Sequence, residues 1–561
     1  MPPRRPPAGK DVDDGPAVRP GRRGPQATSS ASHFSNLVIS AELPRLPPPD
    51  GRAPSTATFD VEGVDLCIVN ALRRAIKADV RTAAVAFDPT RPVDANAGSV
   101  REAGIRFLKN TSVLHNEFLG HRVSMVPVGL DENQIHGYDP SVYKFVLRVK
   151  NRGADLLPVT TADFTVLDAG EAEVPQAMRD ALFPPSPVTG KHILLVRLKP
   201  SPMADGDGEE VHLECRARLG SGREHARWQP VSACHFRNRV DKAAFEASLA
   251  VKVAAAEASA KLALEAEEGG KGTSSLSPEA LALLRAQHAA LDGQRDFERD
   301  ANGEPSAFVF SLKSETRLRP TYLVFEGLRV LAEKVRALAE GIRKDAEAKG
   351  KASNALSASG GAGAGDVEEE ADEWGAPEAS AVPGYASDAP QNQPKAAAAP
   401  PSAYASSAGD PTVTVVGLAN MDDFYEVGVR GEDHTLGNLV QGLLYRRWIL
   451  DGGGDGGPKA AFIGYCQPHP LEDRIVFKVK CAKAGDDVHA LFAEGLKWAQ
   501  GYIEDLSIEW ANFSGLAGNV AVVDAVLKRA DTIARVGGGA GAAGTGTGRG
   551  WATSPRMRRL L

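Results

Sequence analysis

The chain has 561 residues, 42% of them hydrophobic and 24% charged, with a formal net charge of −7 at pH 7. This composition is ordinary for a globular protein of several domains, and the net acidity argues against a surface that coats DNA. The five cysteines contain no C-x-x-C pair, which favours a reducing compartment over a disulfide scaffold. Because no long apolar run and no apolar signal core occur, we expect a soluble, intracellular protein.

Four blocks stand out in the first two thirds of the chain, after a Pro/Arg/Gly-rich start, residues 1–33, that we expect to be disordered. In chain order they are FDVEGVDLCIVNALRRAIK (59–77), NTSVLHNEFLGHRVSMVPV (110–128), GSGREHARWQPVSA (220–233) and FVFSLKSETRLRPTYLVFEGLRVLAEK (308–334). Between the last two blocks, residues 240–300 place Ala, Glu and Lys at helical spacing. Ser277, Pro278 and Glu279 are typical of a helix start, so a helical insertion is predicted there.

A segment rich in Ala, Gly, Ser and Pro follows, at residues 346–410, and its composition predicts a flexible linker. The segment contains an acidic run at residues 366–373. We interpret this run as solvated rather than metal-binding, because a flexible linker cannot preorganise carboxylate ligands.

The last quarter of the chain has a strand–helix–strand–helix pattern. Residues 424–429 alternate as a strand, and Asp433 can cap a helix whose apolar face contains Leu436, Leu439, Val440, Leu443 and Leu444. A second strand alternates as Ile475, Phe477 and Val479, and a helix is predicted over residues 486–504. The Gly/Ala-rich stretch from residue 537 is expected to be disordered.

The motifs EDHTLGN (432–438) and GYCQPHPLE (464–472) make residues 412–515 resemble the small dimerisation subunit of multisubunit RNA polymerases. That subunit is the eleventh of eukaryotic polymerase II and the L subunit of archaea. The four upstream blocks, including NALRR at residues 70–74, are similar in order and content to its larger partner. The partner is the third subunit of polymerase II, archaeal D or bacterial α. The chain therefore resembles a fusion of both members of the polymerase assembly dimer, an arrangement that suggests a large DNA virus.

The resemblance implies an α+β fold with two related RNA polymerase α-type dimerisation domains, made of strands and packed helices, and an additional mostly β insert domain in the larger half. The segments LCIVNALRRAI and HTLGNLVQGLL read as a distant internal repeat, which implies a pseudo-twofold pair of helices. The expected boundaries are a tail at 1–33, the large-half dimerisation domain at 34–77 and 305–345, an insert at 78–239, a helical insertion at 240–304, a linker at 346–410, the small-half domain at 411–516, a C-terminal helix at 517–536 and a tail at 537–561.

Two sets of residues follow from the resemblance. The dimer interface is expected to contain Leu72, Ile76, Leu436, Leu439 and Leu443. The subunit-docking and family-motif residues are Asn70, Arg73, Arg74, Asn110, His121, Arg122, Pro127, His225, Trp228, Glu432, Asp433, His434, Thr435, Gly437, Asn438, Gly464, His469 and Pro470. Among these, Arg73, Arg74, His121 and Arg122 are expected to face the second-largest polymerase subunit.

The function implied is that of a non-catalytic assembly platform in a DNA-directed RNA polymerase. Its expected partners are the largest and second-largest subunits and other small polymerase subunits, with DNA reached only through the complex and no membrane. Catalytic magnesium is expected only in the large subunits, so no catalytic residue and no cofactor are assigned to this chain. The nucleus, a viral factory or a virion are the compartments that transcription implies.

Candidate metal sites have ordinary structural interpretations. His115, Glu117 and His121 do not have the H-E-x-x-H spacing, and Cys466 with His469 lacks a second ligand pair. A further set, Cys215, His225, Cys234 and His235, fits no standard zinc pattern. No metal is therefore predicted.

One alternative from a different class is a free-standing transcription regulator or DNA-binding protein that uses the same dimerisation fold. Such a protein needs a basic face, and only the tails are conspicuously basic. A hydrolase is disfavoured because no G-x-S-x-G motif occurs. A regulator would bind DNA alone with a steep salt dependence, whereas a platform would not.

Overall fold

The computed structural model describes residues 32–41, 55–87, 104–186, 189–203, 207–266, 276–292, 295–359, 413–418, 423–451, 457–483 and 485–516. The predicted C-terminal helix and tail, nearly all of the predicted N-terminal tail and most of the predicted linker lie outside these residues.

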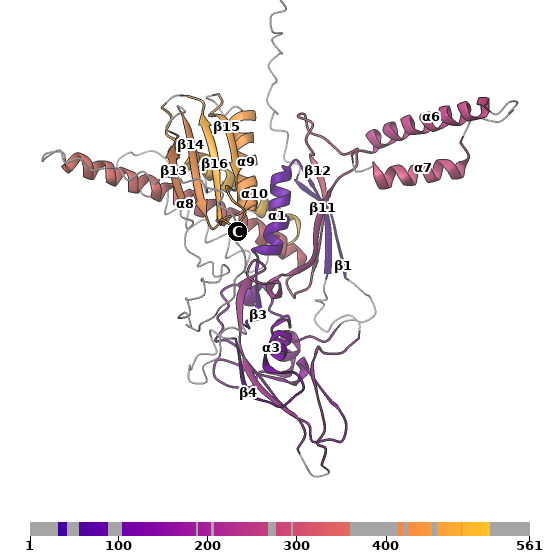
Figure 1. Cartoon of the computed structure of the whole chain (residues 1–561), viewed down its shortest axis with the longest axis vertical. Coiled ribbons are helices and arrows are strands. Elements are labelled where there is room, and N and C mark those ends of the chain that lie inside the picture. Colours follow the sequence, from indigo (N-terminus) through magenta and orange to yellow (C-terminus); the bar gives the residue numbers. More distant parts are fainter. Residues whose placement is uncertain are drawn as a thin grey trace, which may run out of the picture. The chain divides into compact units, whose positions relative to one another are not determined.

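Two dimerisation domains with the same topology form the centre of the fold (Figure 1). Each has a four-stranded antiparallel sheet, in the order β1-β2-β12-β11 for the large half and β13-β14-β16-β15 for the small half. In the large half the elements are β1 (Phe34–Ala41), β2 (Ser55–Glu62), α1 (Leu66–Ala78), β11 (Val231–Asn238), β12 (Ala307–Ser314) and α8 (Pro320–Ser359). In the small half they are β13 (Val413–Gly417), β14 (Phe424–Arg430), α9 (His434–Tyr445) continued by a π turn (Arg446–Leu450), β15 (Ala460–Cys466), β16 (Arg474–Cys481) and α10 (Val488–Phe513).

The sequence accounts for the elements through alternation and capping. In β12, Phe308, Phe310 and Leu312 are fully buried, because residues two apart along a strand share a face. At the start of α9, the carboxylate of Asp433 accepts a hydrogen bond from the backbone N–H of Thr435 at 2.8 Å, as the capping pattern predicts.

One continuous hydrophobic core joins both halves. It contains buried residues of β2, α1, β12 and α8 from the large half and of β14, α9, β16 and α10 from the small half. Trp510 of α10 shows the depth of this contact, since its ring lies 5.0 Å from that of Phe34 and 4.4 Å from that of Phe59. The Trp510 indole also donates a hydrogen bond of 2.8 Å to the carbonyl oxygen of Thr321 in α8. The halves therefore pair within one chain.

The insert of the large half consists mainly of strands and has a core of its own. Its main sheet has the order β4-β9-β5-β7, and two smaller ribbons pair β6 with β8 and β3 with β10. The strands are β3 (Arg81–Val85), β4 (Ile105–Asn110), β5 (Lys144–Lys150), β6 (Leu157–Thr160), β7 (Phe164–Leu167), β8 (Leu194–Leu198), β9 (Glu210–Cys215) and β10 (Ala217–Ser221). The helices are α3 (Asn116–Ser124), α4 (Glu132–Ile135) and α5 (Gln176–Leu182), with 3₁₀ turns at Thr161–Asp163 and Ala226–Trp228.

The helical insertion is a hairpin of α6 (Lys242–Ala266) and α7 (Pro278–Leu291) (Figure 1). As predicted, α7 begins at Pro278, and the Ser277 hydroxyl accepts a hydrogen bond from the backbone N–H of Ala280. His288 is buried between the helices, where its Nε2 lies 2.8 Å from the Ser248 hydroxyl oxygen.

Several expected boundaries differ from the structure. The insert was expected to continue to residue 239, but β11 pairs with β12 and so belongs to the dimerisation sheet. The linker was expected from residue 346, but α8 continues to Ser359, because helix-forming residues and ion pairs such as Arg343–Glu347 prolong it. The prediction for the small half also missed the edge strands β13 and β15.

No described helix is both long enough and apolar enough to cross a bilayer.

Candidate assembly interface

The interface between the halves is built by two helix pairs, α8 with α10 and α1 with α9, and the second pair contains the residues predicted from the sequence. The five residues expected there all lie in the shared core and are at most 4% exposed: Leu72, Ile76, Leu436, Leu439 and Leu443. The two helices approach closely where Gly442 of α9 faces Cys67 of α1, since a Cβ atom on that glycine would lie 2.7 Å from the cysteine sulfur. A larger residue at this position would push the helices apart.

The two ends of this helix pair are joined by ion pairs of the same kind. Asp433, the N-cap of α9, accepts a hydrogen bond from Nη2 of Arg74, near the end of α1, at 3.3 Å. Asp65, the N-cap of α1, accepts one from Nη1 of Arg446, at the end of α9, at 2.7 Å. Each carboxylate thus lies at the positive end of its own helix and opposite an arginine of the other half.

Asp433 belongs to a larger group of charges that we call the inter-half ion cluster. Its large-half members are Arg74, Asp79, Arg223 and Lys334, and its small-half members are Glu432 and Asp433. Nη2 of Arg223 lies 3.1 Å from carboxylate oxygens of both Asp79 and Asp433. Nζ of Lys334 lies 3.1 and 2.9 Å from the two carboxylate oxygens of Glu432.

Burial and charge act in opposite directions on the two acids of the small half. For Asp433, burial alone would raise the pKa, but the Arg223 guanidinium and the hydrogen bonds at Thr435 outweigh it and lower the pKa to about 2. For Glu432, burial raises the pKa, and the nearby Lys334 ammonium offsets this only in part. Asp433 is therefore a stable anion, whereas Glu432 depends on its lysine.

The third sequence block surrounds the buried indole of Trp228. The guanidinium carbons of Arg218 and Arg227 lie 4.3 and 5.3 Å from the ring centroid, in cation–π geometry. Gly220 lies against the same ring, where a Cβ atom would be 2.5 Å from it. Packing around Trp228 thereby fixes the conformation of this loop. The loop in turn places Arg223 beside Asp433 of the small half.

The second block builds α3 and the turn before it. The Asn110 side chain donates hydrogen bonds to the Leu114 carbonyl oxygen and to Asn116. Arg122 donates to the carbonyl oxygen of Leu194 at 2.9 Å, and Pro127 lies in a β-bridge with Ala84.

An exposed group of side chains surrounds α3, and we call it the α3 patch: Val113, Phe118, His121 and Met125. The side chains of Val113 and Phe118 are 63% and 62% exposed, and Met125 is 45% exposed. The His121 ring lies 6.4 Å from that of His225, whose pKa is lowered by burial and by the nearby Arg227.

The two motifs of the small half meet at the beginning of α9. A Cβ atom on Gly437 would lie 2.5 Å from the ring of Tyr465, and the Tyr465 hydroxyl oxygen lies 3.3 Å from Nδ1 of His434. In the turn that follows Gly464, Nδ1 of His469 accepts a hydrogen bond from the backbone N–H of Leu471, so the exposed Pro468–Pro470 segment forms a turn.

The remaining predicted positions have local roles. Asn70 accepts hydrogen bonds from the guanidinium of Arg73 on the same helix. Arg74, expected on a docking surface, donates to Thr435 at 2.7 Å as well as to Asp433, so its guanidinium serves the contact between the halves. Asn438 is half-buried on α9.

Sequence reasoning missed Asp65, Asp79, Arg223, Lys334 and Arg446. Three of these, Asp65, Arg223 and Lys334, lie inside sequence blocks already singled out, and a charged residue beside such a motif was the signal that could have found them.

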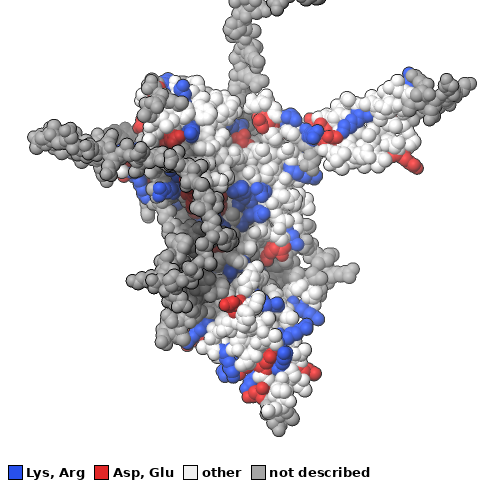
Figure 2. Space-filling model, viewed as in Figure 1, with Lys and Arg blue, Asp and Glu red and all other residues white. Residues whose placement is uncertain are grey.

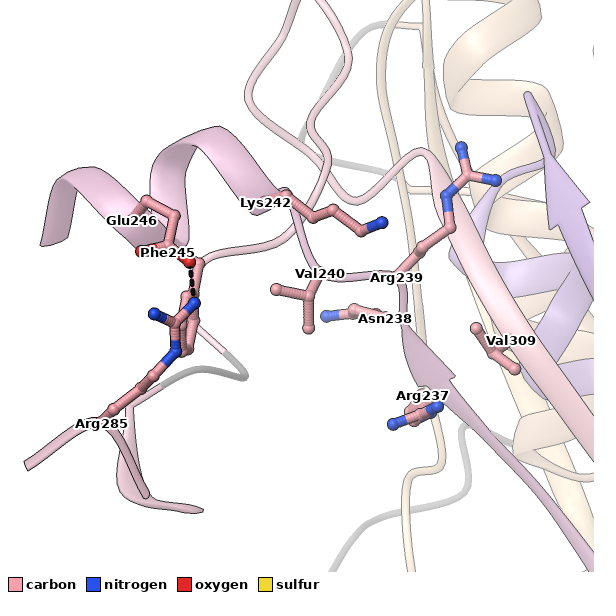
Figure 3. Close-up of a pocket in the computed structure, with 9 residues that line it drawn as sticks. All are labelled: Arg237, Asn238, Arg239, Val240, Lys242, Phe245, Glu246, Arg285 and Val309. Carbon is pink, nitrogen blue, oxygen red and sulfur yellow. Dashed lines mark hydrogen bonds and ion pairs between the residues drawn. The ribbon is translucent and has the colours of Figure 1, made fainter. Parts of the chain in front are cut away.

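Within the described residues, no group of three or more His, Cys, Asp or Glu side chains could hold a metal ion. A shallow pocket of about 470 Å³ lies where the α6–α7 hairpin joins the sheet (Figure 3). Its lining includes Arg237, Lys242 and Phe245, and its carboxylate, Glu246, is paired with Arg285. None of the predicted motif residues lies there, so this pocket belongs to the hairpin stem.

Comparison with known families matches both halves of the chain. Residues 58–335 match one model described as the RNA polymerase Rpb3/Rpb11 dimerisation domain, and residues 425–508 match a second model with the same description.

Three relatives show how far the similarity extends. The chain is 27% identical to the DNA-directed RNA polymerases I and III subunit RPAC1 of Saccharomyces cerevisiae, over 32% of this chain and 53% of the relative. It is 24% identical to the rpac1 subunit of Dictyostelium discoideum, over 51% of this chain and 78% of the relative. It is 28% identical to the subunit Rpo3 of Thermococcus kodakarensis, over 32% of this chain and 54% of the relative.

The chain thus spans about half the length of the yeast and archaeal relatives it matches. These relatives come from cellular organisms, and the viral source suggested by the fusion stays a prediction. The two matched ranges together cover more than half of the chain, which belongs to the RNA polymerase Rpb3/Rpb11 dimerisation family and carries two such domains.

Proposed function

We propose that this chain is a non-catalytic assembly platform of a multisubunit DNA-dependent RNA polymerase. The carrying observation is the single core shared by the two dimerisation domains, which supplies a complete assembly pair without a second chain. The three relatives named above are all subunits of DNA-directed RNA polymerases, which supports the same function.

The proposed docking surface for the second-largest subunit is the α3 patch together with Arg73 and Arg122. Exposed apolar side chains beside cations are typical of protein interfaces, and Phe118 and Met125 supply the apolar part. The rest of the platform would contact the largest subunit and other small subunits.

The proposed platform performs no chemistry of its own. Nucleotidyl transfer requires clustered carboxylates that hold magnesium against phosphates, and we assign these to the two largest subunits. This chain would bind no cofactor and would reach DNA only through the complex, in whichever compartment the polymerase works. Figure 2 supports the proposal that the chain reaches DNA only through the complex, since positive and negative side chains are interspersed over the part of the surface that it shows in colour.

The test is affinity purification of the tagged full-length chain from its native source, followed by an assay for template-dependent RNA synthesis. We expect two very large subunits and polymerase activity in the eluate. The variant Phe118→Asp should reduce their recovery, because it places a charge in the α3 patch. Leu283→Asp on α7 is the matched control, since Leu283 is 61% exposed against 62% for Phe118.

Recovery of the chain alone would contradict the proposal. If the chain recovered alone also bound DNA with a steep salt dependence, the DNA-binding regulator would replace the platform.

A further inference from the structure

The shared topology of the two halves identifies which residues occupy equivalent positions. Along the first helices, Asp65 corresponds to Asp433, because each is the N-cap of its helix. By the same register, Ile76 corresponds to Leu444.

The closing helices α8 and α10 can be aligned through a glycine. A Cβ atom on Gly327 would lie 2.8 Å from Ile76, and one on Gly495 would lie 2.7 Å from Leu444. Since Ile76 and Leu444 are themselves equivalent, the two glycines occupy the same place in their respective halves.

This register reveals a difference between the two sides of the pseudo-twofold pair. Lys334 stands at the position of Tyr502, and Glu432, just before the cap of α9, stands at the position of Val64. One side of the pair therefore has a lysine bound to a glutamate, at 2.9 Å, and the other side has a tyrosine and a valine.

Side chains on both sides of the pair are largely buried, so a charge without a partner would be costly on either side. The side chains of Lys334 and Glu432 are 17% and 12% exposed, and Val64 is 3% exposed. Burial raises the pKa of Tyr502 to about 12, which keeps its phenol neutral. The charges near Tyr502, Asp65 and Arg446, are bound to each other, so a further charge placed on the tyrosine–valine side would lack a partner of its own.

We propose that the Lys334–Glu432 pair makes each half of the chain reject a copy of itself and accept only the other half. In a pair of two small halves, Glu432 would face the tyrosine position, without Lys334 or Arg223. In a pair of two large halves, Lys334 would face the valine position. A buried charge that loses its partner is strongly unfavourable, so both like pairings are disfavoured.

The capping ion pairs do not make this distinction. Both first helices have an aspartate at the N-cap and an arginine toward the end, so Asp65–Arg446 and Asp433–Arg74 contacts have counterparts in a like pairing. The selectivity therefore rests on Lys334 and Glu432, with Arg223 as a second cation near Glu432. It holds whatever larger assembly the chain joins.

The test uses two full-length variants, Lys334→Glu and Glu432→Lys. Each variant alone has like charges at the buried position, so we expect a lower midpoint of thermal unfolding and loss of the in-chain pairing. When the two variants are mixed one to one, the large half of either variant can pair with the small half of the other. In these mixed pairs, the residues at positions 334 and 432 carry opposite charges. Native mass spectrometry should then detect a mixed dimer that neither variant forms alone.

A neutral double variant separates the effect of charge from that of shape. Lys334→Tyr combined with Glu432→Val copies the opposite side of the pair, and we expect it to keep the in-chain pairing of the parent chain. Arg343→Glu is the control, because it places a like charge beside Glu347 at an exposed position of α8, away from the other half, and should leave the in-chain pairing unchanged. Single variants that pair normally, absence of the mixed dimer, or a neutral double variant that loses pairing would each overturn the proposal.

Discussion

At the scale of single residues, Asp433 both caps its own helix and binds the other half of the chain. One carboxylate oxygen caps α9 through the N–H of Thr435, and the other binds Arg74 and Arg223 of the large half. Formation of the helix and binding to the large half therefore depend on the same side chain.

These two tasks can be separated by substitution. Asp433→Asn retains a capping oxygen but loses the charge, whereas Asp433→Ala loses both and should cost about 1 kcal/mol more in the free energy of unfolding. Denaturant unfolding measures the difference. Equal losses for the two variants would mean that the cap contributes nothing here.

The charge of Asp433 also predicts a pH dependence. Its folded pKa of about 2 lies below the ordinary value of 3.8, so the stability it contributes is complete above that value and is lost as the pH falls toward 2. Glu432 acts in the opposite direction, because burial raises its pKa and protonation relieves the cost of its burial. We therefore expect the advantage of the parent chain over Asp433→Asn to disappear between pH 3.8 and about 2. An advantage that persists at the lowest pH would contradict the ion pairs.

At the scale of elements, the two first helices pair across the halves beside the larger contact between α8 and α10. Leu439 is fully buried where α9 meets α1, and Leu→Ala changes at such sites cost about 2–5 kcal/mol. Leu439→Asp adds the burial of a charge and should separate the halves. The insert has its own core, so limited proteolysis should show an intact insert beside a digested small half.

The matched control is Tyr445→Asp at the end of the same helix, where Tyr445 is 43% exposed. It should leave the digestion pattern unchanged. If Leu439→Asp were as resistant as the parent chain, the shared core would not hold the halves together.

The elements also show what sequence reasoning can reach. Local signals predicted the cap of α9 by Asp433 and the start of α7 at Pro278, because each depends on neighbours within a few residues. The contacts Lys334–Glu432 and Arg223–Asp433 join residues 98 and 210 positions apart, and no local pattern indicates such a partner. The edge strand β15 was missed because its pairing with β16 defines it more than its own composition does.

At the scale of the whole molecule, the connection between the halves favours closure within one chain. The Lys349 side chain in α8 donates a hydrogen bond to the carbonyl oxygen of Val415 in β13, so the element before the connection contacts the element after it. Because α8 and β13 are joined by one covalent chain, the effective concentration of one half near the other is raised to roughly millimolar.

Cutting the connection tests this directly. A protease site placed between residues 375 and 405 should yield two fragments that still elute together, because the shared core remains. Their unfolding midpoint should now fall on dilution, since pairing has become bimolecular. An uncut chain treated in the same way is the control, and fragments that separate at once would contradict in-chain pairing through a common core.

The central claim is that one copy of this chain replaces a two-chain assembly dimer in a polymerase. Native mass spectrometry of the complex purified from its source measures this most directly, by counting the copies of each subunit. The account predicts a single copy of this chain with the two largest subunits and no separate small dimerisation subunit. Two copies of the chain, or a separate small dimerisation subunit in the same particle, would contradict it.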